Sequence, residues 1–81
     1  MNKADKLLNK MRHNPLDWRI EDVKTVAQYF GVECRNMGGS HHVFGVRGIA
    51  EKVCLPAHKP IKPAYIRQFV ALIDKVKELS A

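Results

Sequence analysis

The stretch Gly39-Ser40-His41-His42-Val43-Phe44 decides the fold at the centre of this 81-residue chain. Glycines at positions 38 and 39 permit a tight turn. The histidine pair then leads into a β-branched and aromatic run that is typical of a strand. Adjacent side chains on a strand point to opposite faces. Because Phe44 is suited to the core, we expect His42 on the buried face and His41 on the open face.

Short strands are expected on both sides of this turn. The first runs from Val32 to Asn36, the second from His41 to Arg47 and the third from Ala50 to Leu55, with a turn at Gly48-Ile49. Connections this short favour an antiparallel meander. By period-two alternation, Arg47 and Lys52 join His41 on the open face.

Helical patterns surround the strands. One helix is capped by Asn2 and ended by Pro15, a second runs from Ile20 to the residue before Gly31, and a third begins at Pro63. The order predicts an α+β fold in which a three-stranded antiparallel sheet packs on helices. Residues 1–15 are expected to be a basic amphipathic helix in front of a main domain, residues 16–81.

The composition favours an anionic partner. The chain has 14 Lys and Arg against 8 Asp and Glu, a net charge of +6, and its 46% hydrophobic content is ordinary for a folded protein. No apolar run has the length of a membrane span, and the basic N-terminus lacks the apolar core of a signal peptide. Cys34 and Cys54 lack zinc-ligand spacing, so we expect buried free thiols in a reduced, cytoplasmic protein.

Histidines near cations can support phosphodiester chemistry. In an RNase without a metal, a neutral histidine takes the proton of the ribose 2′-OH, a cation stabilises the charge on phosphorus, and an acid protonates the leaving 5′ oxygen. His41 is the candidate base or acid, and Arg47, Lys52 and Lys59 are the candidate cations. For the second acid, His58 is favoured over His42, which is expected to support the site from the core edge.

A metal or cofactor is not expected. His41 and His42 point apart on one strand and cannot readily share an ion, and the sequence has no HExxH or paired CxxC motif.

Three elements together resemble the HicA toxins: Gly39-Ser40-His41-His42-Val43-Phe44, then Val53-Cys54-Leu55-Pro56-Ala57-His58-Lys59, then a helix with Ile66-Arg67-Gln68. The resemblance extends from about Phe30 to Ile73. It implies a fold like the double-stranded-RNA-binding domain (dsRBD) and a ribosome-independent mRNA interferase of a type II toxin–antitoxin system. It also implies that His41 is catalytic and that a HicB-like antitoxin binds the protein.

The chain departs from the family pattern in three places. It has an extra basic helix before Pro15, which could extend the RNA surface or the antitoxin interface. It also has Pro63-Ala64-Tyr65 where the family usually has Gly-Thr-Leu, and Gly45-Val46 where Arg-His is frequent.

The sequence therefore predicts a metal-independent endoribonuclease that cleaves mRNA with His41. Gly39 and Ser40 shape the turn that directs this histidine, while Arg47, Lys52 and Lys59 bind RNA phosphates. Two alternatives stay open: a non-catalytic RNA-binding module of the same fold, and a structural protein whose basic face meets an acidic partner.

Overall fold

Three helices and a three-stranded sheet form the fold in a computed structural model that describes residues 2–57 and 60–80. In chain order the elements are α1 (Lys3–His13), α2 (Ile20–Tyr29), β1 (Glu33–Asn36), β2 (His41–Gly45), β3 (Val53–Pro56) and α3 (Pro63–Ser80). The predicted α+β class and the predicted order of elements are both confirmed. None of the described helices is long and apolar enough to cross a membrane.

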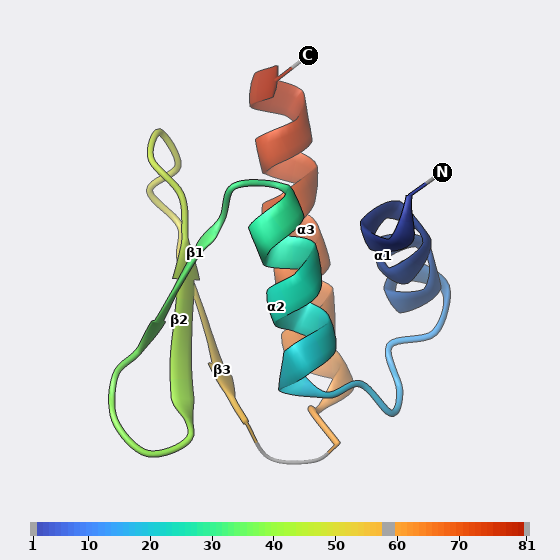
Figure 1. Cartoon of the computed structure of the whole chain (residues 1–81), viewed down its shortest axis with the longest axis vertical. Helices are drawn as coiled ribbons and strands as arrows, with labels where there is room; N and C mark the ends of the chain where they lie inside the picture. Colours follow the sequence, from blue (N-terminus) through green and yellow to red (C-terminus); the bar gives the residue numbers. More distant parts are fainter. Residues whose placement is uncertain (1, 58–59, 81) are drawn as a thin grey trace.

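The elements are arranged in three layers (Figure 1). The antiparallel strands lie in the order β1-β2-β3, with β2 in the centre. Helices α2 and α3 cover one face of this sheet, and α1 packs on the side of these two helices that faces away from it. None of the described elements covers the other face of the sheet, which is the open face, and α1 lies on the opposite side of the molecule. The extra N-terminal helix therefore does not extend the open face.

The strand register decides which side chains face the helices. Phe44 lies opposite Cys34 and Val53, while His42 lies opposite Leu55 on β3. Phe44 is 0% exposed and His42 is 6% exposed. The prediction that the His42 side of the strand is buried, and the His41 side open, is confirmed.

One hydrophobic cluster joins the helices to the inner face of the sheet. Phe44 of β2 and Phe69 of α3 meet edge to face, with ring centroids 5.5 Å apart. Leu8 and Met11 of α1 belong to the same cluster. The division at residue 15 stays a prediction, but the first helix contributes side chains to the common core.

Local signals set the ends of the helices as predicted. The Asn2 side chain accepts a hydrogen bond from the Asp5 amide at 2.9 Å, which caps α1. Gly31 follows α2 with φ of +75°, a conformation that favours glycine.

The connection between β2 and β3 is longer than predicted. Pairing stops at Gly45 and resumes at Val53, so residues 46–52 form a loop rather than the ends of two strands. The Val46 carbonyl accepts a hydrogen bond from the Ile49 amide at 3.2 Å, so the turn already begins at Val46. Both side chains also pack against the core, which draws the loop away from the ladder.

Both cysteines are free thiols, but the prediction that both are buried is wrong. Cys34 is half-buried and Cys54 is exposed, because Cys54 alternates onto the open face of β3.

Candidate functional site

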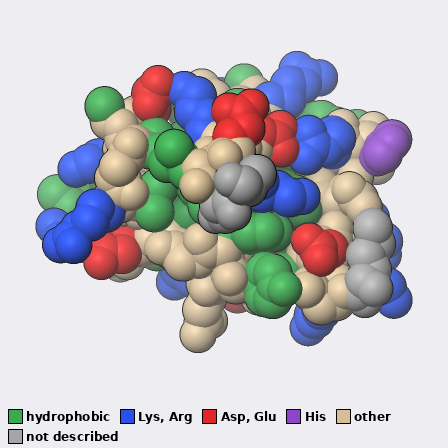
Figure 2. Space-filling view, turned by 90° about the horizontal axis from the view of Figure 1, so that it is seen from above, with side chains coloured by type: hydrophobic (Ala, Val, Ile, Leu, Met, Phe, Trp, Pro, Cys, Tyr) green, Lys and Arg blue, Asp and Glu red, His purple; other side chains and the backbone are tan. Residues whose placement is uncertain are grey.

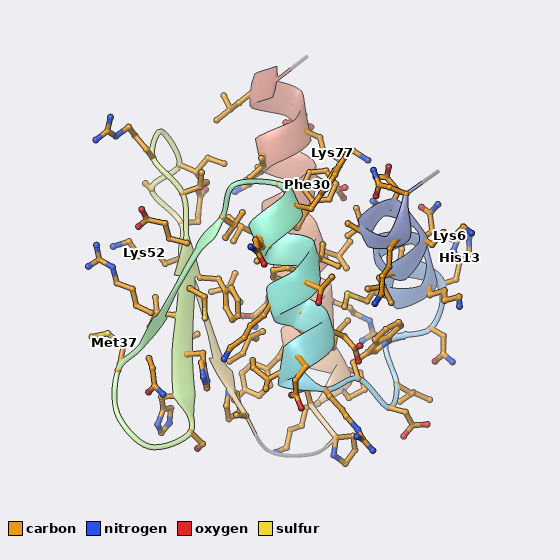
Figure 3. The ribbon with its side chains drawn as sticks, in the orientation of Figure 1. Lys6, His13, Phe30, Met37, Lys52 and Lys77 are labelled. Atoms are coloured by element: carbon orange, nitrogen blue, oxygen red, sulfur yellow. The ribbon has the colours of Figure 1, made fainter. Side chains whose placement is uncertain are left out.

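The open face of the sheet is ordered in rows, since side chains of opposed residues share a face. From the start of β2 to its end, the rows are Met37 with His41 and Pro56, Arg35 with Val43 and Cys54, and Glu33 with Gly45 and Lys52. Figure 3 shows Met37 and Lys52 on the side of the sheet away from the helices, at different heights along the strands. The face thus has a histidine end and a basic end.

His41 is exposed at the first of these ends, on a well-defined turn. Its amide donates to the Gly38 carbonyl at 3.2 Å, and its carbonyl accepts from the Met37 amide at 3.0 Å. Gly38 and Gly39 have φ of +111° and +56°, which explains the two glycines. The Asn36 side chain accepts from the Gly38 amide at 2.9 Å and closes the turn. The backbone therefore fixes where the His41 side chain leaves the sheet.

Ser40 ties this turn to the rest of the sheet. Its carbonyl accepts the Ala57 amide at 2.6 Å, directly after β3. It also lies 3.2 Å from Nδ1 of His42, which donates when Nδ1 carries the proton. His42 is buried and held to the turn, so it is placed to brace His41 rather than to meet a substrate on the open face.

The basic residues predicted on this face are not beside His41. Gly45 lies four residues along β2 from His41, which corresponds to ~13 Å of strand, and Lys52 lies beside Gly45. Arg47 follows in the loop beyond them, and it is also exposed. The open face brings Arg47 and Lys52 together, but it does not bring either of them to His41.

Arg35 is the cation that sequence reasoning missed. It lies opposite Val43, and is therefore a diagonal neighbour of His41, at a Cα separation of about 7–8 Å. The sequence signal that points to Arg35 is the period-two pattern of β1. This pattern places Glu33 and Arg35 on the open face once the pairing of β1 with β2 is known. The side chains of these two residues are 76% exposed, with a long ion-pair contact of 3.9 Å, so their attraction is weak.

Other predicted residues lie elsewhere. His58 and Lys59 are outside the described residues. His13 ends α1 on the far side of the molecule, where its Nδ1 donates to the Asn9 carbonyl at 2.8 Å (Figure 3). His13 is thus a helix-end residue, far from the open face.

Positive charge is distributed widely. In the space-filling view from above, Lys and Arg side chains lie at several places around the molecule and acidic side chains lie among them (Figure 2). Net charge alone therefore does not identify a binding face, and the case for the open face depends on which groups it collects.

Neither the half-buried thiol of Cys34 nor the acidic side chains of the described residues form a further centre. Burial raises the pKa of the Cys34 thiol, and the charge of nearby Lys24 opposes this shift. Cys34 is therefore a protonated thiol and a weak nucleophile at neutral pH. Within residues 2–57 and 60–80, no three or more His, Cys, Asp or Glu side chains are grouped so that they could hold a metal ion.

Comparisons with models of protein families, with curated proteins and with solved structures found no match for this chain. The family interpretation therefore depends on the motif residues themselves and on the arrangement of the open face.

Proposed function

We propose that this chain is a HicA-like toxin with a dsRBD-like fold, a metal-independent endoribonuclease that cleaves mRNA with His41. The observation that carries the proposal is the exposed histidine on a braced glycine turn, at one end of an open sheet face with Arg35 diagonally adjacent. Such an arrangement leaves the imidazole accessible to a strand of RNA while its backbone is held in place.

The reaction needs one proton acceptor and one proton donor. Neutral His41 accepts the proton of the ribose 2′-OH, and the 2′ oxygen bonds to the adjacent phosphorus. The bond from phosphorus to the 5′ oxygen breaks, and an acid returns a proton to that oxygen. The products are a 2′,3′-cyclic phosphate and a 5′-hydroxyl end. If His41 is instead the acid, the two proton transfers exchange partners and the products are the same.

Arg35 suits the reacting phosphate better than the more distant cations do. A guanidinium offers donors in a planar fork that matches two phosphate oxygens. Arg47 and Lys52 then bind phosphates elsewhere on the same strand, together with Lys59. His58 is kept as the proposed second acid because it follows Ala57, whose amide is bonded to the turn that carries His41.

The proposed biological setting follows from the same resemblance. A HicB-like antitoxin would bind the toxin and block access to RNA in the cytoplasm. No cofactor is required by this chemistry.

Cleavage of labelled RNA in EDTA tests the proposal. Wild type, His41→Ala and His13→Ala are compared, since His13 is an exposed histidine far from the open face. Wild type and His13→Ala should cut, and His41→Ala should lose at least ~100-fold of the rate. DNA of the same sequence should bind without being cut, because it lacks the 2′-OH.

Two outcomes would change the assignment. Equal cleavage by wild type and His41→Ala would remove His41 from the mechanism. RNA binding with no cleavage by any variant would favour the non-catalytic RNA-binding module.

A further inference from the structure

A shallow hollow of about 590 Å³ lies at the basic end of the open face. Among the described residues its charged lining is Arg35, Arg47 and Lys52 against the carboxylate of Glu33, three positive charges and one negative, or a net +2. Arg35 borders the end nearer to His41, whereas Arg47 and Lys52 lie at the far end. The floor includes Gly45, where a Cβ would come within 3.2 Å of Lys52 Cγ. The missing side chain therefore lets Lys52 lie across the strand.

The loop that carries these cations is braced from behind. The Glu51 carboxylate accepts a hydrogen bond from Lys75 of α3 at 2.5 Å. The loop's own acid is thus paired with α3 and does not neutralise Arg47 or Lys52. Leu79 of α3 lies 3.8 Å from the position of a Cβ on Gly48, so the tip of the loop is also close to that helix.

We propose that the Arg47 and Lys52 end of this hollow is a phosphate subsite for RNA, separate from the His41 centre, which makes the protein selective for oligonucleotides over dinucleotides. The inference rests on the proposed function and extends it to the class of substrate. The hollow is open and basic, and its lining lacks the aromatic side chains that typically enclose a compact metabolite. It therefore suits the phosphates of a flexible anionic polymer rather than its bases.

The length requirement follows from the strand. The far end of the hollow, at Gly45 and Lys52, lies ~13 Å from His41, because Gly45 is four residues along β2. A stacked strand advances ~3.4 Å along its axis for each nucleotide, so this distance corresponds to about four nucleotides. An unstacked strand covers it with fewer, but the single phosphate of a dinucleotide cannot occupy both places.

Binding to the non-cleaving His41→Ala protein tests the subsite. Chemical-shift titrations with a dinucleotide and a hexanucleotide would be repeated after adding Arg47→Gln or Lys52→Gln. Lys6→Gln is the matched control, since Lys6 lies on α1 at the far side of the molecule (Figure 3). A further titration with inorganic phosphate distinguishes an RNA subsite from a site for the free anion.

The hexanucleotide affinity should fall roughly fivefold in each hollow variant, and the salt slope of log K should fall by about 0.7. The dinucleotide should bind all variants alike, Lys6→Gln should match the parent, and inorganic phosphate should bind more weakly than the hexanucleotide. Equal losses for both lengths, no loss for the hexanucleotide, or no binding of either would overturn the subsite. Inorganic phosphate binding as tightly as the hexanucleotide would also overturn it.

The proposed catalysis by His41 is tested independently of the subsite. It is decided by cleavage with wild type against His41→Ala, whereas the subsite is read from binding by a protein that does not need to cleave.

Discussion

Replacing Leu8 with alanine should remove a large part of the free energy of unfolding of this protein, although Leu8 lies in the layer farthest from the sheet. Its side chain is 1% exposed and belongs to the common hydrophobic cluster. Burial of this kind makes a leucine-to-alanine change cost about 2–5 kcal/mol. Because α1 packs on one side only, it can move to fill part of the space, so we expect the lower half of that range.

The expected loss of ~3 kcal/mol is large for a small domain. At about 4–8 °C per kcal/mol for 60–100 residues, Tm should fall by ~12–24 °C. Circular dichroism measures the whole fold, and Trp18 fluorescence reports on the junction of the first two helices, since its indole N–H donates to the Asn14 carbonyl at 2.7 Å. Lys6→Ala is the control, because Lys6 is exposed on the same helix and should change stability by less than ~0.5 kcal/mol.

A Leu8→Ala protein that melts with its parent would refute this reasoning. It would mean that α1 is not docked in solution and that residues 16–81 hold the core alone. A shift in Trp18 fluorescence without a shift in the main transition would locate the loss at the junction and also contradict the common core.

Three further predictions concern the ion pair, a glycine and the buried histidine. Two hydrogen bonds from Arg12 lower the pKa of Asp74. The pair therefore stabilises the fold above the unfolded pKa of the carboxyl and loses this effect as pH falls through the lowered folded pKa. Urea titrations from about pH 5 to 2 should show that the free energy of unfolding falls less steeply with pH in Arg12→Gln than in wild type. The difference should be at most ~1 kcal/mol, since both side chains are 41% exposed. An unchanged pH profile would count against the pair. Gly31→Ala should lower stability by about 1–2 kcal/mol because φ is +75°, with Gly31→Asn less affected, and equal melting of the two would argue against this strain. His42→Gln, which keeps a donor toward Ser40, should retain more RNA cleavage than His42→Leu; the reverse order of rates would exclude the bracing role.

Local chemistry was sufficient to predict most of the secondary structure. Asn2 and Gly31 mark helix ends through hydrogen bonding and backbone freedom, and both signals act within a few residues. The alternation around Phe44 likewise separated His42 from His41 correctly, because a strand places neighbours on opposite faces whatever surrounds it. The loop at residues 46–52 was mispredicted, since where pairing ends depends on Val46 and Ile49 packing against a core assembled from distant segments.

The sequence by itself determined the α+β class, the order of elements and the face on which His41 lies, since these follow from periodicity and from turn-forming glycines. Only the tertiary structure decided the distances among the candidate site residues. Strand register placed Arg35 diagonal to His41 and moved Lys52 to the other end of the face. The packing of α1 on α2 and α3 placed the first helix on the side away from that face. Register and layer order arise from contacts between residues far apart in the chain, and no local pattern encodes such contacts.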